Sequence, residues 1–449
     1  MEFLKELSFH GSLLEGYISV SGSKGDTSIR LRQLLEKLEL GLRDEGDEDS
    51  TANRGLGSNN LLFMACELLL LGSEAEGFPL LLVEEPEAHL HPQRQLRLMQ
   101  FLQQKADTAR PDGQKIQIIV TTHSPNLASA IQLDNLVLLS SGKAFSLSSD
   151  KTELDASDYG FLSRFLDVTK ANLFFARGLM IVEGDAENIL LPTLAHILGR
   201  DFTGNGVSIV NVGGVGLRRF ARIYQRKNPT DDGTIPVPVA CLADMDVMPD
   251  CAPEIVGRVK AGEAWPDRSK RRWRAKRDFT PEQLNERRAG IRSKASGQRV
   301  ETFVADEWTL EYDLAHAGLA KEVWVAACLA AADNRIAAGK IKHFAVAREA
   351  LRSYAALLAA NPDKEKLASR VYEPFVSDPQ ISKATAAQYL ACILQARYVR
   401  GRLTSESLRA ELPRYIVDAI EYVTRAPENE SVDSELGEAP GTTTESPNA

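Results

Sequence analysis

The chain has 449 residues, a net charge of −9 and an apolar share of 43%. This length supports two to four domains, each with a core of its own. No apolar run reaches the roughly 18 residues of a membrane span, the first residues lack a signal-peptide pattern, and the five cysteines form no C-x-x-C pair. We therefore expect a cytoplasmic globular protein without a disulfide framework, a structural zinc site or a membrane partner.

The first third of the chain alternates strand and helix patterns. Residues 1–20 alternate as strands do, and the acidic, turn-rich stretch 41–53 predicts an exposed loop. The patterns that follow predict a helix at 58–71, a strand at 79–83, a helix at 92–106 and strands at 116–121 and 135–139. Alternating strands and helices indicate a mainly parallel sheet, so residues 1–150 should form one α/β unit, followed by a connector at 151–176.

Two glutamates end the strand of LLLVEEP (80–86). At the carboxyl edge of an α/β sheet, where ligands bind, Glu84 would hold magnesium through water and Glu85 would orient or deprotonate an attacking water. His123 ends the next strand, where it can contact a γ-phosphate, and the glycines of GLGSNN (55–60) let backbone N–H groups approach phosphate. Each motif alone also has a non-functional interpretation. The two glutamates could be the solvated start of a helix, and the histidine could be a structural hydrogen-bonding residue.

In this order, and followed by EAHLHP, the three motifs resemble the C-terminal lobe of the ABC-type ATPase heads of SMC-like and OLD-family proteins. The resemblance implies that the two glutamates form the Walker B pair, with Glu85 catalytic, and that residues 87–92 form the D-loop. It implies that Glu84, Glu85 and a switch histidine, His123, contact ATP and its Mg²⁺. It also implies a homodimer in which a signature at Gly57 and Ser58 caps the ATP bound to the opposite protomer.

The phosphate-cradling loop of such a site is missing from the sequence. A P-loop needs a Gly-Lys-Ser or Gly-Lys-Thr whose lysine neutralises phosphate, and neither tripeptide occurs. The nearest lookalike, SGSKGDTS (21–28), has its lysine before the glycine and is predicted to be a turn. We therefore expect half of a nucleotide site, with the N-terminal lobe outside this chain.

A second α/β series begins near residue 178, with strands predicted at 179–184, 207–212, 237–244 and 301–304. Glu183 ends the first of them and Glu187 follows on the emerging helix, while Asp244 and Asp246 end the third. Residues i and i+2 of a strand share a face, so both aspartates should point into one site. Clustered carboxylates suit Mg²⁺ or Mn²⁺, and two such ions can cleave a phosphodiester bond. The alternative to a metal site is a pair of acidic turns at strand ends without a catalytic role.

This E-G-x-x-E and D-x-D pair resembles the Toprim domain of topoisomerases, primases and OLD-family nucleases, with the Gly-rich VNVGGVG (210–216) near the site. A half ABC head followed by Toprim and then by helices resembles the class 2 OLD family of ATP-dependent endonucleases, over residues 1–424. The resemblance implies a further metal ligand at Glu311, for which Glu307 is a rival, and a phosphate-stabilising lysine at Lys383. The implied catalytic residues of the nuclease site are thus Glu183 and Lys383.

A basic island lies between the D-x-D strand and the last strand. Residues 268–299 hold twelve Lys or Arg and three acidic residues, a net charge of +9 within a chain of net charge −9. Such an island, with Trp273 and Phe279 interleaved, indicates contact with DNA phosphates, although a solvated charged helix is the common alternative. The predicted DNA contacts are Arg268, Lys270, Arg271, Arg272, Arg274, Lys276 and Arg277.

The predicted architecture is α/β: the C-terminal lobe of an ABC-type ATPase, a Rossmann-like Toprim domain and a C-terminal helical region. The Toprim domain should span 177–315 with a basic insertion at 255–299, the helical region 316–424, and a disordered tail 425–449. The expected function is metal-dependent DNA cleavage coupled to an ATPase, in DNA processing or phage defence. An accessory defence protein is an expected partner in addition to DNA. The alternatives are an ATP-gated DNA-binding head with an inactive Toprim site and a topoisomerase or primase fragment.

Overall fold

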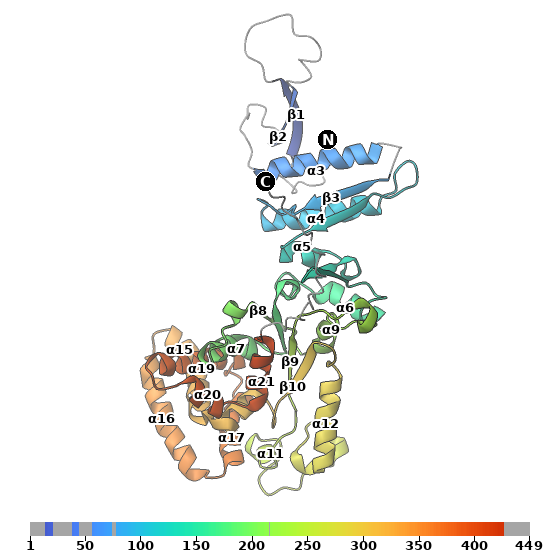
Figure 1. Ribbon diagram of the computed structural model, residues 1–449. Helices are drawn as coiled ribbons and strands as arrows, with labels where there is room; N and C mark the ends of the chain where they lie inside the picture. Colours follow the sequence, from blue (N-terminus) through green and yellow to red (C-terminus); the bar gives the residue numbers. More distant parts are fainter. Residues whose placement is uncertain (1–13, 21–37, 45–55, 74–77, 215, 426–449) are drawn as a thin grey trace, which may run out of the picture.

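The computed structural model describes residues 14–20, 38–44, 56–73, 78–214 and 216–425 (Figure 1). The predicted turn at 21–28 and the predicted tail beyond Arg425 lie outside these residues. Strands β1 (Leu14–Val20) and β2 (Leu38–Asp44) pair antiparallel. The loop predicted at 41–53 is therefore wrong for residues 41–44, because the alternation of Leu38, Leu40 and Leu42 continues the strand into the acidic stretch.

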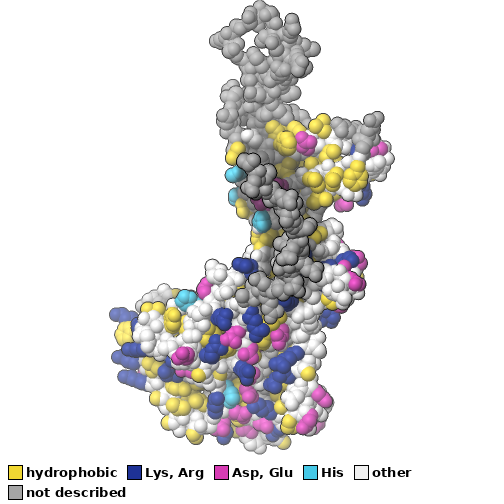
Figure 2. All heavy atoms as spheres, in the orientation of Figure 1, with side chains coloured by type: hydrophobic (Ala, Val, Ile, Leu, Met, Phe, Trp, Pro, Cys, Tyr) yellow, Lys and Arg dark blue, Asp and Glu magenta, His cyan; other side chains and the backbone are white. Residues whose placement is uncertain are grey.

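The N-terminal unit holds two parallel strands with helices on one face. Strands β3 (Leu80–Glu84) and β4 (Gln117–Thr121) pair in parallel, and helices α3 (Leu56–Ser73) and α4 (Pro92–Asp107) share a core with them. On the other face, Leu82 is 66% and Ile119 56% exposed. Apolar side chains accordingly gather on the surface of this unit (Figure 2). The shorter elements that follow are α5 (Pro125–Ala130), η1 (Leu133–Asn135), β5 (Val137–Ser140) and β6 (Lys143–Ser146).

The stretch predicted as a connector packs onto the central sheet. It contains α6 (Ala156–Phe165) and η2 (Ala171–Phe175), whose Leu162 and Leu173 are buried in the same core as Ile181 of the sheet. Asp158 of α6 is fully buried and receives hydrogen bonds from Arg219 and Arg222 of α9. The segment is thus fixed to the sheet by apolar packing and by a buried ion network.

The central sheet has four parallel strands in the order β10-β9-β7-β8. Strand β7 (Gly178–Val182) is buried along its whole length, as expected for a central strand of a parallel sheet. Parallel strands bring their carboxyl ends to one edge, and that edge carries the acidic motifs. The other strands and the adjoining helices are β8 (Val207–Asn211), β9 (Val239–Ala243), β10 (Val300–Val304), α7 (Asp185–Ile197), α8 (Phe202–Asn205), α9 (Leu217–Arg222) and α10 (Pro229–Asp232).

The basic insertion and the C-terminal helices complete the fold. The insertion contains α11 (Ala252–Ile255), η3 (Arg268–Lys270), η4 (Lys276–Asp278) and α12 (Pro281–Ser293). The helical region consists of α13 (Leu310–Leu314), the π-helical turn η5 (Ala315–Leu319), α14 (Ala320–Ala331), α15 (Asp333–Ala337), α16 (His343–Ala360), α17 (Lys364–Tyr372), α18 (Pro374–Ser377), α19 (Lys383–Val399), α20 (Ser405–Glu411) and α21 (Arg414–Val423).

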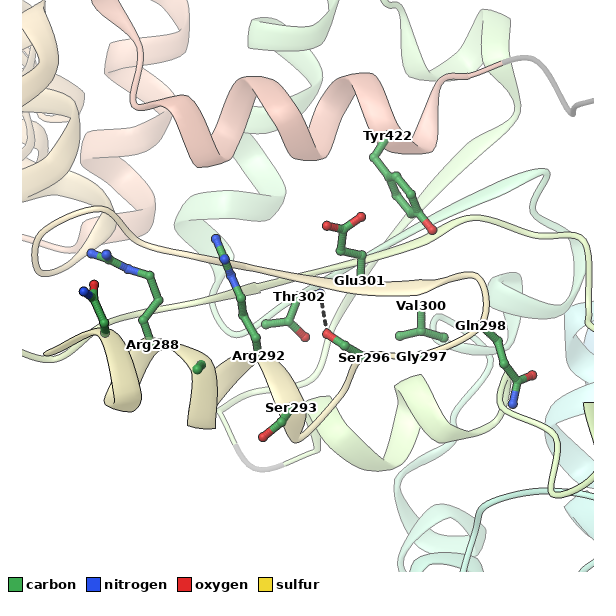
Figure 3. A pocket seen from close by; sticks show the side chains of 12 residues that line it. Arg288, Arg292, Ser293, Ser296, Gly297, Gln298, Val300, Glu301, Thr302 and Tyr422 are labelled. Atoms are coloured by element: carbon green, nitrogen blue, oxygen red, sulfur yellow. Dashed lines mark hydrogen bonds between the residues drawn. The ribbon is translucent and has the colours of Figure 1, made fainter. Parts of the chain in front are cut away.

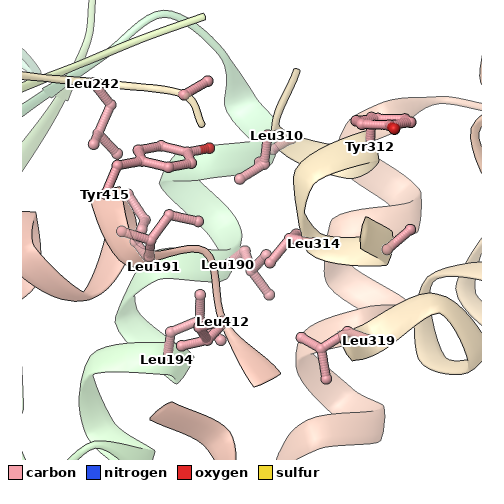
Figure 4. Close-up of a cluster of buried hydrophobic side chains, with 14 of the residues drawn as sticks. Leu190, Leu191, Leu194, Leu242, Leu310, Tyr312, Leu314, Leu319, Leu412 and Tyr415 are labelled. Atoms are coloured by element: carbon pink, nitrogen blue, oxygen red, sulfur yellow. The ribbon is translucent and has the colours of Figure 1, made fainter. Parts of the chain in front are cut away.

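Helix α19 packs against α7 and α14, and α21 packs against β9 and β10, so the helical region closes one side of the sheet. Figure 4 shows the shared core, in which Leu190 of α7 lies beside Leu310 and Leu314 of α13. One stretch of the described chain, Leu310–Ala331, is long and apolar enough to cross a membrane, and 61% of its apolar window of 18 residues is buried in the protein. Its apolar residues are therefore used in this core.

Candidate metal and nucleotide sites

Glu183 follows β7 directly and lies at the carboxyl edge of the sheet. Gly184 is the N-cap residue that precedes α7, whose first turn carries Asp185 and Glu187. Glu187 is half-buried, whereas Asp185 is exposed and accepts a hydrogen bond from Asn211 at the end of β8. The strand-to-helix turn thus places Glu183 and Glu187 on the site side, and it ties α7 to the neighbouring strand.

The D-x-D motif lies in a loop and does not continue strand β9. The strand ends at Ala243, so the prediction that the two aspartates share a strand face is wrong. The backbone N–H groups of Met245 and Asp246 instead donate to the Trp308 carbonyl, at 3.2 and 3.3 Å. Asp246 has φ +54°, in the left-handed region that side chains other than glycine seldom adopt. The loop, not the pleat, therefore sets the direction of the second carboxylate.

The carboxylates of this edge repel one another. Burial, followed by Glu187 and Glu311, raises the pKa of Asp244 well above its ordinary value, and Lys383 opposes this. Burial, followed by Asp246 and Glu187, raises the pKa of Glu183. Raised pKa values of this kind mean that burial and neighbouring acids both disfavour the charged carboxylates.

Glu311 and Lys383 join this cluster from the helical region. Glu311 is 7% exposed on α13 and accepts a hydrogen bond from Lys383, the first residue of α19, at 2.8 Å. Burial alone would lower the pKa of Lys383, but Glu311, Tyr372 and Asp244 together raise it above its ordinary value. Glu311 also raises the pKa of Glu187 after the effect of burial. The pair therefore adds one acid and one fixed positive charge beside Asp244.

Glu307, the rival of Glu311, lies in another network. Its carboxylate pairs with Lys276 at 2.5 Å, and Lys276 also contacts Glu365 at 2.6 Å. Glu311, by contrast, is hydrogen-bonded to Lys383, and both interact electrostatically with Asp244. The geometry therefore favours Glu311 as the additional acid of the cluster.

The donor set of the cluster fits a hard divalent cation by its chemistry. Carboxylate oxygens are the ligands that Mg²⁺ and Mn²⁺ prefer. Burial and then repulsion between the acids raise the pKa values of Glu183, Glu187 and Asp244, and a cation would relieve that repulsion. Within the described part of the chain, no three Asp, Glu, His or Cys side chains converge as a preformed ligand group. The cluster is thus acidic and connected, but more open than a closed metal site.

The nucleotide-type motifs lie at the carboxyl edge of the β3–β4 sheet. Glu84 ends β3, and Glu85 follows with φ +43°, its N–H bonded to the Thr121 carbonyl at 2.9 Å. His123 Nε2 lies 3.5 Å from the Glu85 carboxylate, and both side chains are exposed. Glu87 accepts from the His123 N–H at 2.9 Å, which fixes the loop after β4. The structure therefore brings the predicted Walker B pair and switch histidine together.

Gly57 has a packing role inside this unit. A Cβ atom at this position would lie 2.4 Å from the His89 carbonyl oxygen, so α3 can approach the loop after β3 only with glycine here. Ser58 is within the same helix, but its side chain lies outside the described residues. The predicted signature thus starts where α3 contacts the predicted D-loop.

Much of the basic island serves the fold. Arg271 forms an ion pair with Asp278, both nearly buried, and its guanidinium lies 4.2 Å from the Trp273 ring centroid. Lys276 is held by its two glutamates, and the Arg274 guanidinium donates to the Arg271 and Trp273 carbonyls. Arg268 and Arg277 lie over the rings of Phe279 and Trp265, while Lys270 pairs with Asp267 and Arg272 is exposed.

Helix α12 borders an open groove of about 820 Å³. In Figure 3, Arg288 and Arg292 extend from α12 towards strand β10, and Glu301 and Tyr422 line the other side. Arg292 is exposed, and its side chain forms no ion pair or hydrogen bond with other described residues. The groove therefore offers an exposed cation without an internal partner, as the first part of the island does at Arg272.

Sequence reasoning missed the residues that hold the D-x-D loop. Asp313 accepts the Glu307 and Trp308 N–H groups at 3.1 and 2.8 Å, and Arg287 donates to the Met245 carbonyl at 3.1 Å. Burial raises the pKa of Asp313 to about 7. An acid two positions after Glu311 was a visible signal for Asp313, whereas the partner of Arg287 is 42 residues distant and was not predictable from spacing.

Two models of known protein families match parts of this chain. Residues 5–128 match the model of an AAA ATPase domain, and residues 174–246 match that of the Toprim domain of proteins like the overcoming lysogenization defect (OLD) protein. Both predicted parts, an ATPase-type N-terminal region and a Toprim domain, are thereby confirmed. The second match includes Glu183, Glu187, Asp244 and Asp246.

Three curated relatives are similar over part of the chain. The OLD nuclease of Thermus scotoductus is 26% identical over 37% of this chain and 31% of its own length. The endonuclease GajA of Bacillus cereus is 24% identical over 40% and 30%, and the Escherichia coli protein YbjD 27% identical over 38% and 29%. The matches thus span less than a third of each relative.

Two solved structures are similar at low superposition scores. The C-terminal region of the Burkholderia pseudomallei OLD protein covers 56% of this chain and 98% of its own, at 24% identity and a TM-score of 0.30. The corresponding region of the Xanthomonas campestris pv. campestris OLD protein covers 56% and 94%, at 22% identity and a TM-score of 0.30.

Proposed function

We propose that this chain, in which an AAA ATPase domain precedes an OLD-like Toprim domain, is a metal-dependent endonuclease that cleaves DNA. The observation that carries the proposal is the acidic cluster at the carboxyl edge of the central sheet, in which burial and then neighbouring carboxylates raise the pKa values of Glu183 and Asp244. Two relatives bear the names nuclease and endonuclease.

The proposed ligands of two Mg²⁺ or Mn²⁺ ions are the carboxylates of the cluster: Glu183, Glu187, Asp244, Asp246 and Glu311. When bound, such a pair supplies an activated water and stabilises the leaving oxygen of a phosphodiester. Lys383 is held beside the cluster by Glu311, and its ammonium would offset negative charge on the scissile phosphate. Glu183 would in addition accept a proton at its carboxylate.

We propose that the DNA backbone contacts the exposed cations of the insertion, including Arg272 and Arg292. Arginine side chains hold phosphate without reading sequence. The proposed ATP contacts, with Mg²⁺, are Glu84, Glu85 and His123, completed by a second copy whose Gly57 and Ser58 would cap the nucleotide. Bacterial DNA processing or phage defence in the cytoplasm is the proposed setting, supported by the names of the matched family and relatives.

The alternative is an ATP-gated DNA-binding head whose Toprim site is inactive. One observation favours it: within the described residues, the acidic side chains do not form a preformed ligand group. The two functions differ in what the purified chain does to plasmid DNA when a divalent metal is added. An inactive head should bind the plasmid and leave it supercoiled.

The test is plasmid nicking by the wild-type chain and by Asp244→Ala and Glu183→Ala, with Mg²⁺ or Mn²⁺ and with EDTA. We expect each substitution to reduce cleavage by at least about 100-fold, comparable to losing a main electrostatic contribution to catalysis. Glu349→Ala, on the exposed face of α16, is the control and should cleave as the wild type does. Cleavage that persists unchanged in both site variants would contradict the proposal, because it would come from a contaminant or another site.

A further inference from the structure

The residue between the two aspartates of the D-x-D motif is hydrogen-bonded through both its backbone N–H and its backbone carbonyl. Met245 is 2% exposed, and its N–H donates to the Trp308 carbonyl at 3.2 Å. Its own carbonyl accepts from the guanidinium Nε of Arg287, at 3.1 Å. Buried backbone groups are costly to leave unpaired, so these two contacts fix the path of the loop between Asp244 and Asp246.

Arg287 comes from α12, in the basic insertion, and its neighbour Arg288 makes a second contact of the same kind. Arg288 donates to the Asp306 carbonyl at 2.8 Å. Asp306 precedes the Glu307–Trp308 turn, which Asp313 holds through two backbone N–H groups. Two consecutive arginines of α12 therefore fix the two loops that carry Asp246 and Trp308.

The conformation of Asp246 shows why the loop needs such support. A side chain at φ +54° costs free energy, and it persists only where surrounding contacts impose it. The hydrogen bonds to Trp308 and Arg287 are contacts of that kind, since they fix both the N–H and the carbonyl of the preceding residue. Without Arg287, the buried Met245 carbonyl would lose its charged donor, and the loop could relax to a commoner backbone conformation.

We propose that Arg287 is a positioning residue, which holds the Asp244–Asp246 loop in the conformation that binds a divalent cation. In sequence it belongs to the basic island, but its guanidinium donates a hydrogen bond to the backbone carbonyl of the buried Met245. The proposal rests on the proposed function, because it assigns Arg287 a task at the same acidic cluster. It also makes α12 a physical link between the DNA-contacting insertion and the acidic loop.

The test measures Mn²⁺ binding to the full chain by titration calorimetry, alongside nicking at increasing Mn²⁺. Arg287→Met retains the apolar stem and removes the donor, so we expect Mn²⁺ affinity to fall by roughly 10-fold or more, as for other residues that orient metal ligands. Cleavage should recover at saturating Mn²⁺, and Arg287→Lys, which keeps a charged donor, should restore part of the affinity. DNA affinity without metal should stay unchanged in Arg287→Met.

Arg292→Ala, on the same helix, is the matched contrast: it should weaken DNA binding and leave Mn²⁺ affinity unaltered. Hydrogen exchange of the peptide 242–250 gives a second measurement that does not need activity, and Arg287→Met should speed exchange there more than elsewhere. Wild-type Mn²⁺ affinity in Arg287→Met, or a loss confined to DNA affinity, would overturn the inference. If the wild-type chain itself neither binds Mn²⁺ nor cleaves DNA, the proposed function fails instead.

Discussion

Asp246 and Glu85 both have positive φ, and both lie in loops at the carboxyl ends of parallel strands. Glu85 directly follows β3, and Asp246 lies in the loop after β9. Such strain concentrates where function requires a particular side-chain direction. The sequence predicted the acids themselves, because carboxylates at strand ends form a recognisable pattern. It could not predict their conformations, since these depend on hydrogen bonds to Trp308 and Thr121, which are distant in sequence.

The repulsion within the acidic cluster predicts a pH dependence of stability. The pKa of Asp244 is raised well above its ordinary value of 3.8 by burial and neighbouring acids. An acid with a higher pKa in the folded state favours folding at low pH, and this contribution is lost as pH rises from about 4 through the folded pKa. In EDTA, the wild-type chain should therefore become less stable as the pH increases across that range.

Asp244→Asn should relieve this repulsion. At pH 8 without metal we expect a gain in unfolding free energy on the order of 1 kcal/mol, as for other residues kept for function at a cost in stability, and a rise in Tm of ~2–4 °C. The measurement is thermal unfolding between pH 5 and 9 in EDTA. Added Mn²⁺ should stabilise the wild type and not the variant. A variant that is less stable than the wild type at pH 8 would show that Asp244 is paired favourably in the folded protein.

The strands and helices were mostly predictable because their periodic patterns are strong. Helix α3 and strands β3, β4 and β7–β10 lie within a few residues of their predicted bounds. The tertiary contacts of the polar residues were not predictable from the sequence. Asp158 fixes the connector through an ion pair with Arg219, and Arg271 of the basic island pairs with Asp278 inside the protein. A charge pattern in sequence does not show whether its partner is phosphate, solvent or another side chain.

Asp158 gives a prediction for the contact between α6 and α9. Its carboxylate is fully buried, with Arg219 at 3.0 Å, Arg222 at 3.4 Å and Arg218 at 3.7 Å. Asp158→Ala leaves these arginines without their acid, and removing one partner of a buried ion pair costs roughly 3–5 kcal/mol. Denaturant unfolding should show this loss. Arg218→Ala, whose side chain is 45% exposed, should change stability little, and equal effects of the two would contradict this account.

The insertion gives a prediction for DNA binding. Arg272 and Arg292 are exposed and have no side-chain partner among the described residues, so both are free to contact phosphate. Replacing both with alanine should flatten the slope of log affinity against log salt by about two, roughly one per phosphate contact, whatever the DNA sequence. Arg271→Ala is the contrast: it should lower stability and leave the slope unaltered. An unchanged slope in the double variant would mean that this surface faces solvent.

At the scale of the whole molecule, the carboxyl edges of the central sheet and of the β3–β4 pair differ in how many elements contribute residues to them. The central sheet has four strands, and the helical region contributes Glu311 and Lys383 to its acidic edge. The β3–β4 pair has one face exposed at Leu82 and Ile119, although parallel strands are normally covered on both faces. The acidic cluster of the central sheet therefore draws on both the sheet and the helical region, whereas the described residues of the nucleotide-type edge form one wall.

This difference leads to the prediction about ATP. The wall formed by Glu84, Glu85 and His123 adds negative charge to a triphosphate, and magnesium offsets that only when P-loop amides and a lysine hold the other side. The sequence contains no Gly-Lys-Ser or Gly-Lys-Thr. We therefore expect negligible ATP hydrolysis by this chain, measured as phosphate release, under conditions in which its metal-dependent nicking persists.

Supplying a separate lobe that carries a P-loop should restore hydrolysis, because the amides and the lysine would complete the phosphate cradle opposite Glu85. Glu85→Gln should then abolish turnover and retain ATP binding, since the amide can still accept a hydrogen bond but cannot take a proton from water. Glu349→Ala is again the control and should hydrolyse as the complemented wild type does. Steady ATP turnover by the purified chain alone, sensitive to Glu85→Gln, would mean that a phosphate-binding loop of another sequence exists in this chain, and it would make the bare β3–β4 face irrelevant to the nucleotide site.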